Sequence, residues 1–265
     1  MNFIHGYWSY VDAVKALARH YNRSPDMITE DEIKAFFLHL INEKHASRSS
    51  ITIHLCAMKF FFEKTLGKVF PVFDLIRPQS STKLPIVLTL EEIKEILSHV
   101  RKPVPRAALL AIYSCGLRLS EGTSLQIQDI DSKRMVVMVR GGKGGKDRYV
   151  PLAQRTLEHL RAYWKIERSA TWLFPSRKGD GPLSHGSLQK TFKAALKESG
   201  VKKKVSIHTL RHSYATHLLE NGVDIRVIQE ILGHASTSTT VIYTHITKKS
   251  VEALANTVNR IMSDL

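Results

Sequence analysis

The chain has 265 residues, of which 43% are hydrophobic and 24% are charged, as in globular proteins with one large or two modest domains. Its 39 Lys and Arg residues exceed its 24 Asp and Glu residues and give a net charge of +15. This excess excludes an acidic or halophilic protein and indicates a polyanionic partner, either nucleic acid or an anionic membrane surface. No apolar run approaches the ~20 residues of a membrane-spanning helix, so we expect no membrane partner.

The amino-terminal residues lack the basic and apolar regions of a signal peptide. Only two cysteines occur, Cys56 and Cys115, and both lie inside apolar helical patterns. These features predict a cytoplasmic protein whose thiols are reduced and packed.

Helical periodicity dominates the first part of the chain. A helix is predicted over residues 7–21, a second begins at the capping box of Thr29 and Glu32, and a third extends from Ser47 to Leu66 and ends at Gly67. Residues 68–87 lose this periodicity and contain three prolines, which indicates a linker. We therefore predict a helical domain over residues 1–82 and a second domain over residues 83–265.

The positive charge is concentrated in the second of these domains. Residues 1–82 contain 10 basic and 8 acidic side chains, a net charge of +2, whereas residues 83–265 contain 29 and 16, a net charge of +13. If the partner is nucleic acid, the second domain supplies most of the attraction; otherwise the charge is a solvated surface.

The second domain is predicted to be mainly α with a small antiparallel β-sheet. A capping box at Thr89 and Glu92 begins a helix, and an apolar helix over 105–115 is closed by Gly116. A further helix starts at Ser120 and extends to about Ile127. Residues 135–139 and 148–152 are β-type and flank a basic hairpin tip. Later helices are expected at about 154–167, 185–199, 207–221, 224–232 and 238–260.

The glycine-rich tip of residues 141–146 is not a phosphate-binding P-loop. Only three residues separate Gly141 from Gly145, and Asp147 follows Lys146 where the P-loop requires Ser or Thr. Lys143 and Lys146 can still reach an anion bound elsewhere, or the tip is a solvated turn.

A His–Arg group opens one of the later helices. His208, Arg211 and His212 share one helical face. The two histidines could bind zinc, but Thr209 replaces the glutamate of the H-E-x-x-H motif and Arg211 would place positive charge beside the metal. An arginine fork and an imidazole suit a phosphodiester better, while helix capping or pairing with a carboxylate is the alternative.

Three further residues are candidates for chemistry. Arg118 lies in a turn between two helices, where Glu121 could orient it, and His234 lies in a Leu-Gly-His-Ala segment nine residues before Tyr243. A phenol with a pKa near 10 is a poor nucleophile at neutral pH unless cations stabilise its phenolate. Each of these residues alone is equally consistent with packing or capping.

Taken in order, these motifs resemble the tyrosine recombinases, the site-specific DNA recombinases of the phage-integrase type. The matching segments are residues 115–121, the hairpin 142–148, residues 208–222, and residues 232–245. The resemblance covers essentially the whole second domain, and the helical first domain is similar to the family's core-binding module. The sequence departs from the family pattern at Gly122 and Thr123, where many members carry bulkier apolar residues, which predicts looser packing beside Glu121.

The resemblance implies a role for each of six residues. Arg118 and Arg211 would clamp the scissile phosphate, and Lys143 would protonate the leaving 5′ oxygen, with Lys146 as a rival for that role. His208 and His234 would hydrogen-bond the phosphoryl oxygens and assist proton transfer. Tyr243 would attack phosphorus and form a 3′-phosphotyrosyl link, and no metal or ATP is expected.

The resemblance also implies double-stranded DNA as the partner and a homotetramer acting on two DNA sites, monomeric when free, as in integrases of mobile elements. The amphipathic pattern of residues 247–265 is expected to dock into a neighbouring subunit, and the alternative is that it packs on its own domain. Two other functions remain open: a DNA-binding protein of this fold without catalysis, and strand relaxation like that of type IB topoisomerases.

Overall fold

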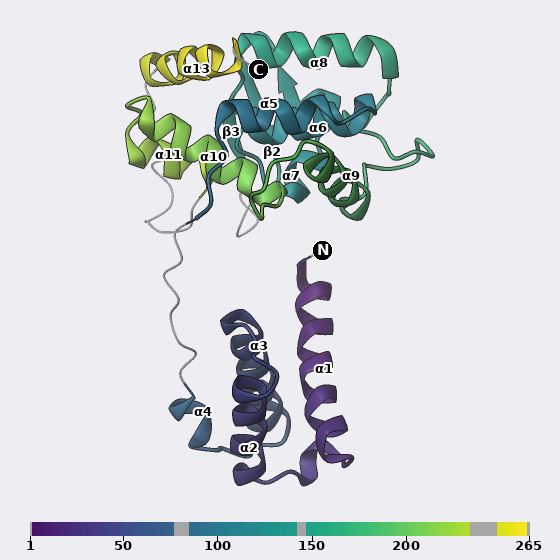
Figure 1. Ribbon diagram of the computed structural model, residues 1–265, viewed down its shortest axis with the longest axis vertical. Helices are drawn as coiled ribbons and strands as arrows, with labels where there is room; N and C mark the ends of the chain where they lie inside the picture. Colours follow the sequence, from purple (N-terminus) through teal and green to yellow (C-terminus); the bar gives the residue numbers. More distant parts are fainter. Residues whose placement is uncertain (1, 77–84, 142–146, 234–247, 264–265) are drawn as a thin grey trace. The chain divides into compact units, whose positions relative to one another are not determined.

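The computed structural model describes residues 2–76, 85–141, 147–233 and 248–263 (Figure 1). The chain divides into two compact units, residues 1–83 and 84–265, and each has its own hydrophobic core. The fold class predicted from the sequence is confirmed, because the described residues are mostly helical with one three-stranded antiparallel sheet. None of the described helices is long and apolar enough to cross a membrane.

The first unit is helical. Its elements are α1 (Asn2–Tyr21), a 3₁₀ turn (Pro25–Met27), α2 (Glu30–Asn42), α3 (Arg48–Lys59), a π-helical turn (Phe60–Thr65) and α4 (Val72–Leu75). The predicted capping box forms at the start of α2, where the backbone N–H of Thr29 donates to Glu32 Oε2 at 2.9 Å. The core lies between α1, α2 and α3 and contains Leu17, Ile33, Phe36, Phe37, Met58 and Phe62.

Two expectations for this unit are wrong. Residues 72–75 form α4 rather than linker, because Val72 and Phe73 are buried in the core of the unit. The Phe73 ring lies 6.1 Å from that of Phe62, between centroids. Cys56 is exposed on α3 rather than packed. Residues 77–84 of the predicted linker lie outside the described residues.

The second unit contains the helices α5 to α11, α13 and the sheet. Its elements are α5 (Leu90–Ser98), α6 (Pro103–Ser114), α7 (Leu119–Thr123), a 3₁₀ turn (Ile127–Asp129), β1 (Ile130–Asp131), β2 (Val136–Val139), β3 (Arg148–Pro151), α8 (Gln154–Glu167), α9 (His185–Glu198), α10 (Ile207–Glu220), α11 (Ile225–Leu232) and α13 (Lys248–Ser263).

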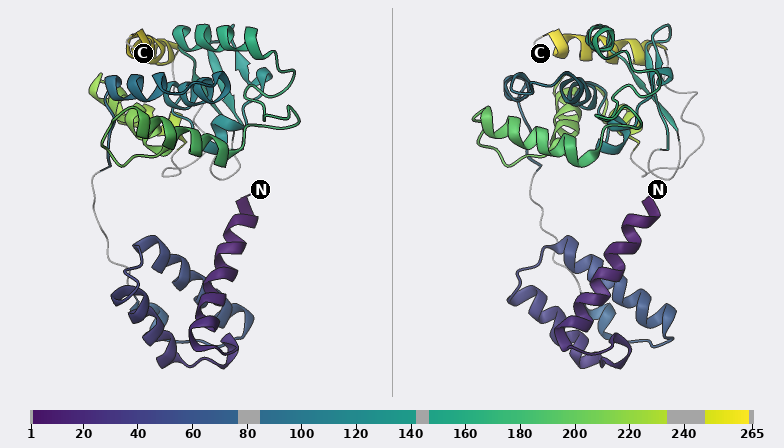
Figure 2. Two further views of the ribbon diagram at one scale, coloured as in Figure 1. Left: turned by 45° about the vertical axis from the view of Figure 1, so that its right-hand side comes forward. Right: turned by 90° about the vertical axis from the view of Figure 1, so that its right-hand side faces the viewer.

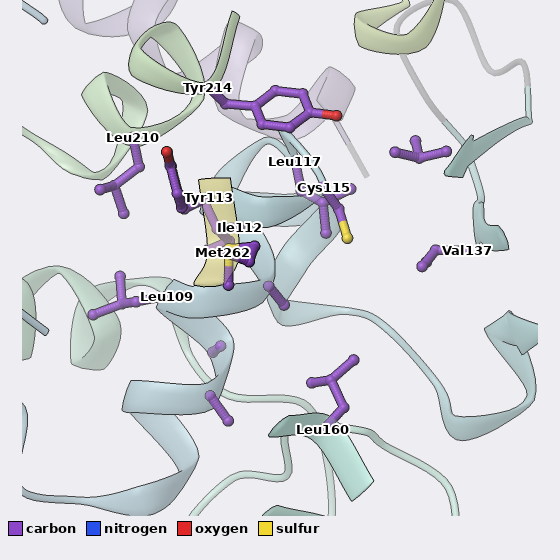
Figure 3. Close-up of a cluster of buried hydrophobic side chains, with 14 of the residues drawn as sticks. Leu109, Ile112, Tyr113, Cys115, Leu117, Val137, Leu160, Leu210, Tyr214 and Met262 are labelled. Carbon is purple, nitrogen blue, oxygen red and sulfur yellow. The ribbon is translucent and has the colours of Figure 1, made fainter. Parts of the chain in front are cut away.

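Helix α6 is the centre of this unit. It packs against α8 on one side and α10 on the other, and Figures 1 and 2 show these layers from three directions. Ile112 and Tyr113 of α6 are 0% and 1% exposed, and Figure 3 shows them within the core cluster together with Leu210 and Tyr214 of α10. The predicted apolar helix is therefore a buried one, and its C-terminal end lies deep in the unit.

The hairpin predicted around the basic tip is confirmed. Strands β2 and β3 are antiparallel, with Val137 opposite Val150, and the buried side chains Val137, Val139 and Val150 face the core. Strand β1 was not predicted; it is two residues long and adds to β2 with Ile130 opposite Val137. The tip itself, residues 142–146, lies outside the described residues.

Helix α7 is shorter than expected and ends at Thr123. The hydroxyl of Thr123 donates to the carbonyl of Leu119 at 2.9 Å, and that of Ser124 donates to Ser120 at 2.7 Å. These side chains satisfy the last carbonyls of the helix and compete with its continuation.

Helix α13 begins at Lys248, so the first residues of the helix predicted over 238–260 lie outside the described residues. Its apolar face is packed on its own unit against α8, α10 and β3. Leu254, Val258, Ile261 and Met262 are each at most 5% exposed there. In the single chain, the tail therefore packs on its own unit, and docking into a neighbouring subunit stays a prediction.

The packing beside Glu121 is tight rather than loose. A Cβ added to Gly122 would lie 2.4 Å from Cγ1 of Ile112 and 2.9 Å from its Cδ1. Thr123 is 1% exposed. Gly122 therefore allows α7 to approach α6 more closely than any larger residue would permit.

We expect Gly122→Ala to lower the free energy of unfolding by up to about 2 kcal/mol, because an overpacking cost of about 1–3 kcal/mol exceeds the roughly 1 kcal/mol that alanine gains over glycine in a helix. Urea denaturation measures the change. In an Ile112→Ala background the same substitution should lower the free energy of unfolding by less, because the side chain that it would strike is shortened. The control is Gly186→Ala in α9, where an added Cβ meets no atom within 4 Å; equal effects at both glycines would contradict the steric explanation.

Candidate active site

Arg118 is held at the amino-terminal end of α7. Its backbone N–H donates to Glu121 Oε2 at 2.8 Å, and its Nη1 donates to Glu121 Oε1 at 2.7 Å. The prediction that Glu121 orients Arg118 is thus confirmed. The Arg118 side chain is 25% exposed. Its guanidinium donates to Glu121 Oε1 and, at 3.2 Å, to the carbonyl of Gly233. Because a guanidinium has five N–H donors, further donors can serve a ligand.

Glu121 is the centre of an arginine cluster that we define as Arg118, Arg148 and Arg211. The Glu121 side chain is 5% exposed. Arg148 donates to it through both terminal nitrogens, Nη1 to Oε1 and Nη2 to Oε2, each at 2.8 Å. Arg211 Nη1 lies 3.6 Å from Oε2. One buried carboxylate therefore contacts all three guanidiniums.

The pKa of Glu121 reflects these contacts. Burial raises it, but the hydrogen bonds from Arg148 and from the backbone and side chain of Arg118 outweigh burial and lower it from 4.5 to about 2. Glu121 is therefore ionised throughout the physiological range and available as a fixed negative charge between the arginines.

Arg211 lies on α10 and is 3% exposed. Its Nη1 donates to the carbonyl of Gly116 at 2.7 Å, and its Nη2 donates to the carbonyl of Leu232. Burial lowers the pKa of its guanidinium to about 10, and the charge of Arg118 adds to this. Gly116 makes the approach possible: its φ is +59°, and an added Cβ would lie 2.5 Å from the Tyr214 ring.

The C-terminal end of α11 accepts a hydrogen bond from each of the three arginines. Arg148 Nε donates to the carbonyl of Ile231 at 2.7 Å, Arg211 to Leu232, and Arg118 to Gly233. These are carbonyls that a helix end leaves without an intrahelical partner, and they carry the negative end of the helix dipole. The next residue in the chain is His234, which lies outside the described residues.

The cluster carries excess positive charge. Three guanidiniums surround one carboxylate, and within the described parts of the chain Glu121 is the acidic side chain in ion-pair contact with them. The helix end contributes only about half a negative charge. Arginine forks in a partly buried position are suited to the non-bridging oxygens of a phosphate. The cluster is therefore built to receive an anion.

His208 lies on the first turn of α10, one turn before Arg211, and is exposed. Its ring centroid is 4.6 Å from that of His212, with the planes nearly perpendicular. The structure thus brings Arg118 and Arg211 together around Glu121 and places His208 on the helix that carries Arg211. Lys143, His234 and Tyr243, as well as Lys146, lie outside the described residues.

The zinc alternative gains no further ligands from the described chain. Over residues 2–76, 85–141, 147–233 and 248–263, no group of three His, Cys, Asp or Glu residues is placed to hold a metal ion.

Arg148 is the member of the cluster that sequence reasoning missed. It lies inside the hairpin segment that carries the family resemblance, but a single arginine at the end of a basic hairpin is indistinguishable from a solvated charge in the sequence. Its position directly after the basic tip and at the start of a β-type run was the available signal.

We expect Glu121→Gln to lower the free energy of unfolding by about 3–5 kcal/mol at pH 7, because it leaves buried guanidiniums without their counter-charge. Since the pKa of Glu121 is lower in the folded state than its ordinary value of 4.5, its contribution is complete above pH 4.5 and lost as the pH falls toward about 2. Urea denaturation at several pH values should therefore show the difference between the two proteins narrowing on acidification.

The matched control is Glu198→Gln, which removes the exposed pair with Arg101. It should change the stability by no more than about 1 kcal/mol. If the difference in free energy of unfolding between the wild type and Glu121→Gln stayed constant down to low pH, the assigned ionisation of Glu121 would be wrong.

Comparison with known proteins identifies the family of both units. Residues 87–250 match the phage integrase family, and residues 6–71 match the phage integrase N-terminal SAM-like domain. Tyrosine recombinase XerA of Pyrococcus furiosus is 39% identical over 228 residues, 84% of this chain and 79% of the relative.

Two solved structures share the fold. A crystal structure of XerA recombinase is 31% identical and has a TM-score of 0.54 over 93% of this chain and 89% of that one. A lambda integrase tetramer bound to a Holliday junction is 22% identical and has a TM-score of 0.72 over 88% of this chain and 72% of that one. With its family match covering most of the second unit, the chain belongs to the phage integrase family and is a tyrosine-type site-specific recombinase.

Proposed function

We propose that the arginine cluster binds the scissile phosphate of a DNA duplex and that the chain cuts and rejoins DNA through a 3′-phosphotyrosyl intermediate. The observation that carries this proposal is the buried excess of positive charge around Glu121. A phosphodiester carries one negative charge, and nucleophilic attack concentrates more charge on its equatorial oxygens. Fixed guanidiniums stabilise that charge without reorganising during the reaction.

The proposed chemistry assigns one role to each predicted residue. Arg118 and Arg211 hold the non-bridging oxygens, and His208 and His234 hydrogen-bond the phosphoryl group. Tyr243 attacks phosphorus, so that a bond from phosphorus to the phenol oxygen forms while the bond to the 5′ oxygen breaks. The phenolic proton leaves through a histidine. These assignments follow the family resemblance, with the geometry around Glu121 as support for the two arginines.

Lys143 donates a proton to the departing 5′ oxygen, which completes the proton balance of the cleavage. It lies five residues before β3 in the sequence, so the strand that follows it is the one that begins with Arg148. The phosphotyrosyl bond keeps the energy of the broken bond, and the proposed reaction therefore uses neither metal nor ATP.

We propose that residues 1–82 form the core-binding domain and residues 83–265 the catalytic domain. The division of the chain into compact units supports this assignment, as do the two family segments. Because the second domain carries 29 basic and 16 acidic side chains, we expect it to supply most phosphate contacts and a steep salt dependence of binding.

In solution we expect Tyr243→Phe to abolish formation of the covalent protein–DNA adduct, because the nucleophilic hydroxyl is removed. The substrate is a nicked duplex carrying a site obtained by covalent capture from a random-sequence library with wild-type protein. DNA affinity should change less than about threefold, since phosphate contacts remain. Adduct is measured on denaturing gels, with EDTA present throughout to exclude a metal-dependent nuclease.

The control is Tyr149→Phe, which removes the hydroxyl of an exposed tyrosine on β3 beneath Arg134 and should leave adduct formation intact. Adduct with Tyr243→Phe would refute the assigned nucleophile. If wild type bound DNA without any adduct, the chain would be a DNA-binding protein of this fold. Relaxation of supercoiled DNA without recombinant product would indicate topoisomerase-like activity.

We further propose that four copies act on two DNA sites in the cytoplasm, as in integrases of mobile elements, and that the free protein is a monomer. The lambda integrase tetramer on a Holliday junction supports the assembly on DNA. The burial of Leu254, Val258, Ile261 and Met262 in their own unit supports the free monomer, since these side chains are then unavailable to a partner.

Sedimentation of the free protein should therefore give a species of 30.0 kDa, and addition of the captured DNA site should produce a larger complex. A dimer or tetramer without DNA at micromolar concentration would contradict the proposed role of the packed tail. Sedimentation-velocity profiles at several protein concentrations distinguish these results.

A further inference from the structure

Arg148 links three segments that sequence and resemblance associate with the reaction. It is the first residue of β3 and its side chain is 11% exposed. Its Nη1 and Nη2 donate to the two oxygens of Glu121, and its Nε donates to the carbonyl of Ile231 at 2.7 Å. Every nitrogen of the guanidinium is thus bonded to a different acceptor atom.

The partners of Arg148 lead directly to proposed catalytic groups. Glu121 orients Arg118, Ile231 lies three residues before His234, and β3 follows the hairpin tip that contains Lys143. From this geometry we infer that Arg148 is a positioning residue for strand transfer, fixing β3, Glu121 and the end of α11 relative to one another. This inference rests on the proposed function of the site.

Only arginine provides these contacts from one position. A guanidinium is a planar fork that matches a carboxylate with two parallel bonds and still has its Nε–H directed elsewhere. A lysine ammonium keeps the charge but acts as a point donor. Substitution by lysine therefore separates the charge of residue 148 from its geometry.

The electrostatic repulsion that Arg148 introduces argues against a role in stability alone. Arg148 places a third guanidinium beside Arg118 and Arg211, and its charge adds to the lowering of the pKa of Arg211, which is caused first by burial. Buried ion pairs can often be replaced by apolar packing without loss of stability. A contact needed only for packing would not require repulsion between arginines.

A second arginine on the same hairpin provides a matched control. Arg140 follows β2, and its Nε and Nη2 both contact Oδ1 of the buried Asp129 at 2.8 Å. It therefore also ties a strand end to a buried carboxylate. Its pair does not involve Glu121 or the arginine cluster.

The experiment compares Arg148→Lys with Arg140→Lys in single-turnover adduct formation on the nicked, captured DNA site, with the full chain at saturating concentration. We expect Arg148→Lys to reduce the cleavage rate on the order of 10²-fold, as for other small misplacements of catalytic groups. DNA affinity should stay close to wild type, and the rates are compared below the melting temperature of each variant. Arg140→Lys should keep the wild-type rate within about threefold.

The pH dependence distinguishes positioning through Glu121 from loss of structure. In Arg148→Lys we expect the pKa of Glu121 to be lowered less than in the wild type, because the hydrogen bonds from Arg148 are the largest of the causes that lower it. The ratio of wild-type to Arg148→Lys rates should therefore increase as the pH is lowered toward the pKa of Glu121 in the variant.

A double-mutant cycle provides the final criterion. If Arg148 acts through Glu121, the rate of Glu121→Gln combined with Arg148→Lys should equal that of Glu121→Gln alone. Independent, multiplying losses would overturn the inference, as would a wild-type rate or a pH-independent ratio for Arg148→Lys. If Arg148→Lys fails to fold, Arg148→Gln replaces it, since its amide can still donate to Glu121. Absence of adduct with wild type would instead refute the proposed function.

Discussion

The second unit depends on the distribution of three guanidiniums between one carboxylate and one helix end. Arg118, Arg148 and Arg211 all contact Glu121, and the three also donate to the consecutive carbonyls of residues 231–233. Like charges this close would repel one another strongly in a poorly hydrated interior. Two kinds of acceptor stabilise the cluster. Glu121 supplies a full negative charge, and the end of α11 supplies carbonyls that no intrahelical N–H can reach.

This constraint explains the glycines at the close approaches. Gly116 ends α6 with a positive φ and turns its carbonyl toward Arg211, in a space where a Cβ would strike Tyr214. Gly122 brings α7, and with it Glu121, against Ile112 of α6. Gly233 ends α11 with a φ of +62° beside the Arg148 side chain. The ends of two helices and the start of a third thus converge on one buried carboxylate.

Much of this fold was predictable, because its signals are local. The capping boxes at Thr29 and Thr89 and the spacing of apolar residues identified helices close to their observed bounds. Helix α4 and strand β1 were missed because elements of a few residues have no period to detect, and their formation depends on distant partners. The candidate site likewise divides into residues with local sequence signals and residues that depend on distant contacts. Motifs singled out Arg118 and Arg211, whereas Arg148 joins their cluster through contacts with residues 27 and 83 positions away.

The same arrangement relates stability to catalysis. Without DNA, the positive charge of the cluster exceeds the negative charge of its neighbours among the described residues. Burial, together with the charge of Arg118, lowers the pKa of Arg211 to about 10. A phosphodiester would supply the missing negative charge, and the additional charge that develops during attack would be stabilised further. Interactions that strengthen between ground and transition state are the ones that accelerate a reaction. A cluster fully neutralised in the free protein would stabilise the reacting phosphate less, so the proposed function requires the excess positive charge around Glu121.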